Sequence, residues 1–125
     1  MRRGEIWTVA GGGDFMGKPR PVVILQDDRF ADTGSVTFCP FTTNPTEAPF
    51  FRLEVQPTAE NGLQAPSRLM VDKITTLRRT RLGRRLGRLG SDEMTELRQA
   101  VLVFLGFSGE PDSEPTDATI GAPEA

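Results

Sequence analysis

The sequence contains no histidine, and this absence restricts its chemistry more than any other feature of its composition. Histidine is the usual general base near neutral pH, the partner of serine and cysteine nucleophiles, and the commonest metal ligand. A single cysteine, Cys39, excludes an internal disulfide and, without histidine, a Cys/His zinc site. Because Cys39 lies in a strand-like segment between Phe38 and Pro40, we expect a buried, inert thiol.

Long apolar runs are also missing. No stretch approaches the roughly 20 apolar residues that cross a bilayer. The first residues lead directly into a strand pattern instead of an apolar signal segment, so we expect a cytoplasmic protein without membrane contact. Asp27 and Asp28 are adjacent carboxylates, but the sequence suggests no third ligand, and we expect neither a metal nor another cofactor.

The charges are divided unevenly along the chain. Residues 110–125 hold five acids and no base, and removing these acids from the net charge of −2 leaves residues 1–109 at +3. Thirteen of the 15 basic residues are arginine, whose planar guanidinium suits phosphate binding. We therefore predict one domain over residues 1–108, followed by a disordered acidic tail over residues 109–125.

Alternating and β-branched segments predict a mainly β protein. Strands are expected at residues 4–9, 19–25, 35–41, 50–55 and 68–76, with a helical turn and a short strand around 85–89. Pro40 limits the third strand to a strand end or a sheet edge. One helix is predicted from Ser91, as its N-cap, to Gly106. Its apolar face comprises Met94, Leu97, Val101, Leu102 and Leu105. These elements predict a small, strongly curved sheet or barrel closed by a C-terminal helix.

Arg20 lies between two prolines, directly before an apolar strand. Pro19 and Pro21 fix their own φ angles and favour extended geometry in the residues before them, so the backbone of Arg20 has little freedom. The arginine is either an ordinary residue at the mouth of a sheet, paired with a carboxylate, or a side chain held in position for a ligand.

The remaining reactive groups are arginine, lysine, hydroxyls and a few carboxylates. Such groups stabilise a charged phosphorus transition state without a metal, but they do not readily activate water. RNA brings its own nucleophile, since its 2′-OH lies beside the scissile phosphate. An arginine with a nearby hydroxyl would therefore favour cyclisation and release of a 5′-OH end.

Four sequence blocks resemble those of the MazF/PemK-type toxins. They are GEIW at 4–7, KPRPVVI at 18–24, CPFTT at 39–43 and MVDKIT at 70–75. The resemblance covers residues 3–107 and implies a small SH3-like barrel, usually a homodimer. It also implies metal-independent cleavage of single-stranded RNA at short sequences, silenced by a cognate antitoxin.

By position, the resemblance implies that Arg20 is the catalytic arginine and that Thr42 assists at the phosphate. Asp72 matches an acid that acts in some members as base or as a positioning group. Some of those members carry an arginine two residues earlier, where this chain has Met70, so the resemblance implies no second catalytic arginine at that position. RNA binding is assigned to Lys18, Thr43, Asn44 and Lys73, with residues 11–18 matching a loop that borders the RNA groove.

Other interpretations stay open at this point. Thr42 could cap a turn, and Asp72 could pair with Lys73 or Arg68. The arginine-rich residues 78–88 form a solvated face, contact RNA phosphates, or receive an acidic antitoxin segment. The acidic tail is inert or mimics RNA over the basic groove. As a whole, the chain could instead resemble the CcdB-type toxins, which bind DNA gyrase without catalysis, or act as an RNA-binding barrel without turnover.

Overall fold

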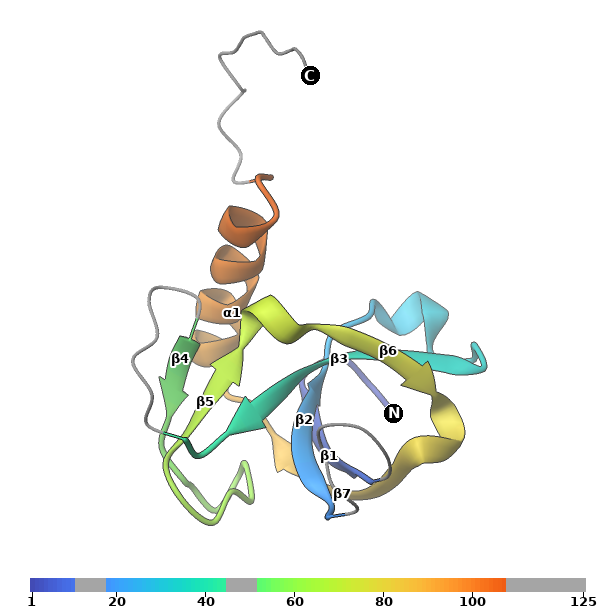
Figure 1. Cartoon of the computed structure of the whole chain (residues 1–125), viewed down its shortest axis with the longest axis horizontal. Helices are drawn as coiled ribbons and strands as arrows, with labels where there is room; N and C mark the ends of the chain where they lie inside the picture. The colour runs from blue at the N-terminus through green and yellow to red at the C-terminus, as the bar shows by residue number, and fades with distance from the viewer. Residues whose placement is uncertain (11–17, 45–51, 108–125) are drawn as a thin grey trace, which may run out of the picture.

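The computed structural model describes residues 1–10, 18–44 and 52–107. The first strand, β1 (Glu5–Val9), pairs antiparallel with β2 (Arg20–Ile24) on one edge and with β7 (Leu82–Arg88) on the other. The sheet follows the order β4-β5-β3-β2-β1-β7, and β6 also pairs with β3. As Figure 1 shows, this mostly antiparallel sheet bends strongly, and one C-terminal helix packs against it. The predicted fold class is confirmed, and the described strand pairs leave the sheet open between β4 and β7.

The strand β3 (Ser35–Thr42) organises the sheet because it has partners on both edges. One edge pairs with β2, and the other with β5 (Ser67–Met70) and β6 (Thr75–Arg78). Of the two positions predicted from Pro40, the sheet edge is therefore excluded and the strand end remains. Pro40 does lie near its end, between the part that pairs with β6 and the part that pairs with β5, where a missing N–H disturbs the ladder least.

The predicted single strand over residues 68–76 is wrong, because the 3₁₀ turn η3 (Val71–Lys73) divides it into β5 and β6. The pairing registers show the cause. Phe38 lies opposite Thr75 but Phe41 lies opposite Leu69, so three residues on β3 correspond to six on its partner. The extra residues leave the ladder as a turn, at the position where polar side chains interrupt the apolar run.

The remaining elements follow the expected order. They are η2 (Asp28–Phe30), β4 (Arg52–Val55), η4 (Arg79–Arg81) and α1 (Ser91–Phe104). The N-cap of α1 is Gly90 and not Ser91, and the Gly90 N–H donates to the Glu93 carboxylate at 3.1 Å. Gly106 ends the helix with φ of +82°, as predicted. Leu105, expected on the buried face, is 53% exposed because it lies past the last packed turn.

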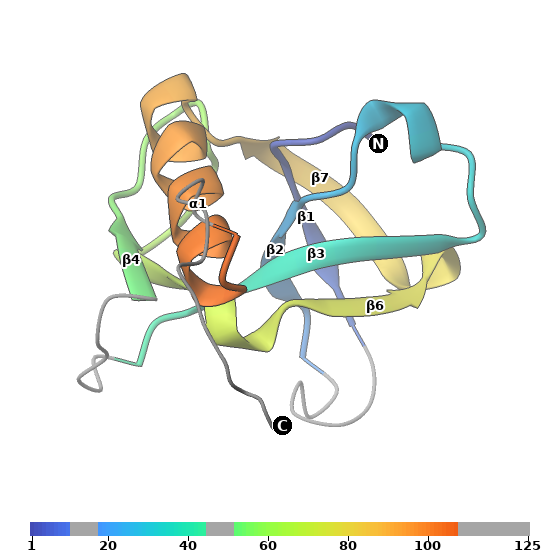
Figure 2. The same cartoon turned by 90° about the horizontal axis from the view of Figure 1, so that it is seen from above.

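Two apolar clusters lie on the two faces of the sheet. Ile6 and Val23 belong to the cluster that α1 covers through Leu97, whereas Val22 and Ile24 belong to the other. Strand β2 is therefore buried on both faces, as its apolar run predicted. Figure 2 shows α1 lying across the side of the sheet that carries β4. No helix among the described residues is long and apolar enough to cross a membrane.

We expect Gly87→Ala to destabilise the fold. A Cβ at position 87 would collide with the Glu60 carbonyl oxygen and come within 2.7 Å of the Asn61 carbonyl carbon, both of which are backbone atoms. Overpacking of this kind costs about 1–3 kcal/mol of unfolding free energy. The matched control is Gly34→Ala, where nothing lies within 4 Å of the added atom. Urea unfolding of both variants checks this, and equal stability would contradict it.

Candidate functional site

Arg20 and Thr42 lie at the same end of two neighbouring strands. Arg20 is the first residue of β2 and Thr42 is the last residue of β3. The last pair that joins these strands on this side is Val22 with Pro40. Arg20 and Thr42 therefore each lie two residues beyond the same pair, and both side chains are partly buried.

Strand alternation also puts these two side chains on the same face. Successive side chains in a strand point to opposite faces, so residues two apart share one. On β2, the side chain of Arg20 therefore shares a face with those of Val22 and Ile24. On β3, the side chain of Thr42 shares a face with those of Val36 and Phe38. All four apolar residues belong to the cluster on the face away from α1. The Arg20 guanidinium and the Thr42 hydroxyl thus lie on the face away from α1, next to the apolar cluster of that face.

Arg68 on β5 adds a second guanidinium, which the sequence analysis did not place in the site. It lies directly opposite Thr42, and directly opposed residues have Cβ atoms about 5 Å apart on one face. On its other side, Arg68 faces Glu54 of β4. No motif marks Arg68, because its position follows only from the register between β3 and β5.

The Thr42 hydroxyl accepts a hydrogen bond from the Asn44 backbone N–H at 3.1 Å. This bond supports the turn-capping interpretation, and it uses a lone pair of the oxygen and not the hydroxyl proton. The proton is therefore available to donate to a ligand. Thr43 and Asn44 are exposed beside it, and Lys18 is exposed before β2. The predicted loop at residues 11–17 and the predicted tail over residues 109–125 lie outside the described residues.

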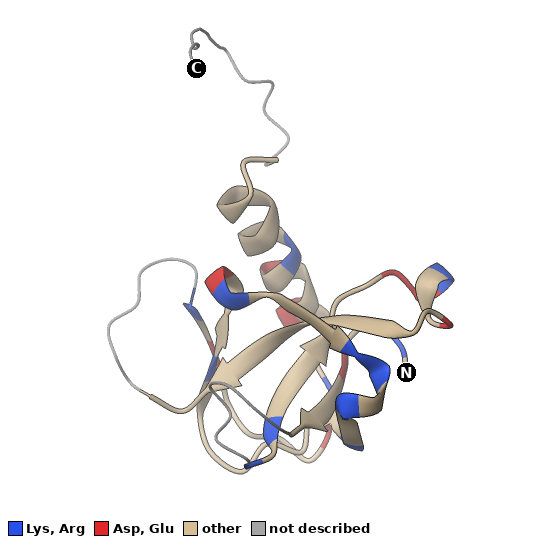
Figure 3. Cartoon of the chain, turned by 45° about the vertical axis from the view of Figure 1, so that its right-hand side comes forward, with Lys and Arg blue, Asp and Glu red and all other residues tan. Residues whose placement is uncertain are grey.

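The arginine-rich stretch borders the same end of the sheet. Val9 at the end of β1 has Arg20 opposite it on β2 and Leu82 opposite it on β7. The Ala10 N–H donates to the Arg81 carbonyl at 3.4 Å. Neighbouring strands are about 4.8 Å apart, and β1 lies between β2 and β7. The junction of η4 with β7 is therefore roughly 10 Å from the Arg20 backbone. Figure 3 shows basic residues gathered where β6 leads through η4 into β7.

Asp72 forms a two-bonded ion pair with Arg52 of β4. Arg52 Nε and Nη2 donate to the two carboxylate oxygens at 3.0 and 3.1 Å, and the exposed fractions of the two side chains are 17% and 22%. From the sequence, Lys73 or Arg68 was the expected partner, and in the structure Asp72 pairs with Arg52 instead. Partial burial works to raise the pKa of Asp72, but the Arg52 hydrogen bonds and the positive charges of Arg52 and Lys73 hold that pKa below 3.8.

Asp72 and Lys73 are not brought next to Thr42. Both lie in η3, which packs against α1, and Asp72 is four residues beyond Arg68, the residue opposite Thr42. At about 3.3 Å per extended residue and less in a 3₁₀ turn, this is a separation on the order of 10 Å. Lys73 is exposed. The structure therefore divides the predicted residues into one group at the end of β2 and β3 and another in η3.

Cys39 takes no part in either group. It is fully buried, and this burial, together with the nearby Asp72 charge, raises the pKa of its thiol to about 12. The thiol stays protonated at neutral pH and cannot serve as a nucleophile. The expectation of a buried cysteine is confirmed.

The fold is a bent antiparallel sheet with a C-terminal helix, and an arginine and a threonine lie at one end of two neighbouring strands. These features define a class of small, mainly β proteins whose polar site suits phosphate ligands. The family described as PemK-like, MazF-like toxin of type II toxin-antitoxin system matches residues 2–105, and the chain belongs to this family. A probable endoribonuclease MazF of Mycolicibacterium smegmatis is 52% identical over 109 residues, which cover 87% of this chain and all of that protein.

Solved structures of such toxins share the fold. The Mycobacterium tuberculosis toxin MazF-mt6 matches with a TM-score of 0.69 at 27% identity, over 82% of this chain and 96% of that one. A MazE-MazF crystal structure (Form-II) from Deinococcus radiodurans matches with a TM-score of 0.66 at 25% identity, over 86% and 97% of the two chains. The resemblance drawn from the four sequence blocks is thereby confirmed.

Removal of the Asp72 carboxylate should destabilise the protein in a pH-dependent way. The folded pKa lies below the ordinary value, so the ion pair contributes stability above about pH 4, and this contribution disappears as the pH falls through the folded pKa. We expect Asp72→Asn to lose roughly 2 kcal/mol at pH 7 and less at pH 3. Urea unfolding at both pH values measures this, with the exposed Asp32→Asn as control. A loss equal at both pH values would contradict the ion-pair account.

Proposed function

We propose that this protein is a metal-independent endoribonuclease toxin that cleaves single-stranded RNA, including mRNA, at short sequences in the cytoplasm. The observation that carries the proposal is the position of Arg20 and Thr42, each two residues beyond the Val22–Pro40 pair and on one face. Membership of a toxin family and 52% identity to a probable endoribonuclease MazF support the same function. The activity is assigned to residues 1–108.

The reaction follows from the groups available at this face. The ribose 2′-oxygen attacks the adjacent phosphorus, its bond to phosphorus forms, and the bond from phosphorus to the 5′-oxygen breaks. The products are a 2′,3′-cyclic phosphate and a 5′-OH end. The 2′-OH proton passes to solvent, and the leaving oxygen takes a proton from solvent. Arg20 places two N–H donors on the phosphate, and the Thr42 hydroxyl donates a third hydrogen bond as negative charge develops.

Asp72 is assigned a positioning role and not that of the general base. A carboxylate whose pKa is held down by two hydrogen bonds from a guanidinium has little tendency to take up a proton. Its ion pair with Arg52 connects η3 to β4. The strand β5, which carries Arg68, lies between β4 and η3 in the chain and pairs with β4. We propose that this pair keeps the RNA-binding face in shape.

RNA binding outside the scissile phosphate falls to exposed polar residues around it. Lys18 stands at the entrance of β2, and Thr43 and Asn44 follow Thr42 directly. We assign these three residues, together with Lys73 and Arg68, to phosphate and base contacts. Arginine and lysine supply the sequence-independent part of the affinity, which makes binding sensitive to salt.

Two features support cleavage without a metal: the sequence has no histidine, and the described carboxylates do not gather into a group of metal ligands. Among residues 1–10, 18–44 and 52–107, no three His, Cys, Asp or Glu side chains come together as a ligand group. The nucleophile comes from the substrate, so the protein needs only to position the phosphate and stabilise its charge.

A first test incubates the purified protein with single-stranded RNA in EDTA. We expect 2′,3′-cyclic phosphate and 5′-OH ends, and no cleavage when the nucleotide at the cut carries 2′-deoxyribose. Arg20→Ala and Thr42→Ala should each lower kcat by about two decades or more, since each removes a transition-state donor. Arg29→Ala, an exposed arginine of η2, is the matched control and should cleave normally. Full activity of Arg20→Ala would overturn the mechanism, and gyrase-dependent DNA breaks without RNA cleavage would indicate a CcdB-like toxin instead.

We further propose that the protein acts as a homodimer and is neutralised by a cognate antitoxin, as the family description of a toxin-antitoxin system indicates. Apolar side chains are exposed around the end of α1: Val103 at 62%, Leu105 at 53% and Phe107 at 69%. Exposed apolar groups that lie together mark interaction surfaces.

Sedimentation at micromolar concentration should therefore give the mass of a dimer. Val103→Glu places a charge on the apolar end of α1 and should weaken the dimer by tenfold or more, as expected for a buried unpaired charge at an interface. Phe30→Glu alters a residue of similar exposure on η2 and should leave the mass unchanged. A monomeric parent protein would contradict the proposed assembly.

A further inference from the structure

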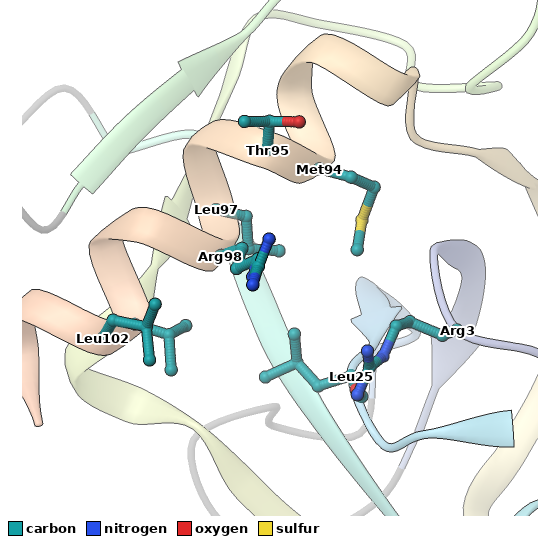
Figure 4. Close-up of a pocket in the computed structure, with 8 residues that line it drawn as sticks. Arg3, Leu25, Met94, Thr95, Leu97, Arg98 and Leu102 are labelled. Carbon is teal, nitrogen blue, oxygen red and sulfur yellow. The ribbon is translucent and has the colours of Figure 1, made fainter. Parts of the chain in front are cut away.

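A groove of about 380 Å³ runs along the opposite side of α1 from Val103. Its walls are mainly aliphatic, from Leu25, Met94, Leu97, Val101 and Leu102. Figure 4 shows the side chains of α1 on one side of this groove and those of Leu25 and Arg3 on the other. The groove belongs to the face that α1 covers and is separate from the face that carries Arg20 and Thr42.

Two guanidinium groups stand at this groove. Arg98 lines it from α1, and no described residue forms a hydrogen bond or ion pair with its side chain. Arg3 lines it from the N-terminal segment, where its Nε donates to the Leu25 carbonyl at 2.8 Å. The carboxylates near Arg3 are already engaged, since Asp28 accepts from the Arg3 backbone N–H and pairs with Arg2. An apolar trough with an unpaired guanidinium suits an extended acidic segment.

The chain leaves α1 beside this groove. Gly106 reverses the backbone with φ of +82°, and the Phe107 N–H donates to the Leu102 carbonyl at 2.6 Å. Leu102 is itself a wall of the groove, and Arg98 lies one helical turn further along it, about 6 Å away. The residue that precedes the acidic tail is therefore held at one end of the groove.

We propose that this groove is the docking site for the acidic tail of the same chain, residues 108–125. Glu110, Asp112 and Glu114 follow Phe107 by three to seven residues, a distance that an extended chain covers at roughly 3.3 Å per residue, so their carboxylates reach Arg98 and then Arg3. The tail carries no base to oppose this pairing. The family match covers residues 2–105, so the acidic tail lies outside it. The docking proposal does not rest on the nuclease activity.

A spin label on Ser113→Cys tests the proposal in the full chain. Cys39 is buried and its thiol has a pKa of about 12, so the label attaches at position 113. The isotope-labelled protein is diluted with an excess of unlabelled, label-free protein, which confines the effect to one chain in any dimer. We expect strong broadening of the amide signals of Arg3 and Leu25 and little broadening at Leu53, which lines the groove on the other side of α1.

Arg98→Gln should lower the ratio of docked to undocked tail by roughly fivefold, as expected for the loss of one ion pair, and high salt should act in the same direction. Arg84→Gln, an exposed arginine on β7, is the control and should leave the broadening unchanged. Equal broadening at Leu25 and Leu53, or broadening centred on Arg20, would overturn the proposal.

A chain that ends at residue 108 separates this proposal from the proposed nuclease function. Because the groove lies away from the Arg20 face, truncation should leave RNA affinity and cleavage unchanged while exposing the groove to amide exchange at Val101 and Leu102. Tighter RNA binding by the truncated chain would show that the tail covers the Arg20 face instead, and would overturn the docking site while leaving the nuclease intact.

Discussion

The pairing of β2 with β3 is the constraint on which the site depends. Val22, Val23 and Ile24 are fully buried, so the strand cannot slip by one residue without turning its apolar side chains to the wrong clusters. The same register carries Arg20 and Thr42 to one face and one end of the sheet. Burial of aliphatic side chains in the core thus positions two polar groups that are not themselves part of it.

A second constraint acts across β4, β5 and η3. The division of one predicted strand into two leaves Asp72 in a turn, where Arg52 holds it with two hydrogen bonds. Partial burial disfavours both charges, and the pairing offsets this cost. Under the proposed function, this pairing lets the carboxylate keep the shape of the site instead of taking up a proton.

Much of the fold was predictable from local patterns. Alternation located β1 and β3, the apolar run located β2 with burial on both faces, and the arginine-rich segment gave a helical turn followed by a strand. The errors differ in cause. The N-cap is Gly90 and not Ser91, and its N–H bonds to the nearby Glu93 carboxylate. Leu105 as a core residue and an unbroken strand over 68–76 depended on where the chain meets a distant neighbour, such as the three-residue offset between β5 and β6 along β3.

The order of residue types along the chain set which chemistry is available: no histidine, an arginine held between prolines, hydroxyls at a strand end, and a tail whose charged residues are all acidic. Those properties belong to single residues or short segments, so they do not depend on the folded structure. Tertiary structure alone decided that Arg68 lies opposite Thr42, that Asp72 pairs with Arg52, and that the chain leaves α1 beside a groove containing Arg98. Each of these contacts joins residues through strand register or helix packing, which depend on the burial of the whole core and not on any short segment.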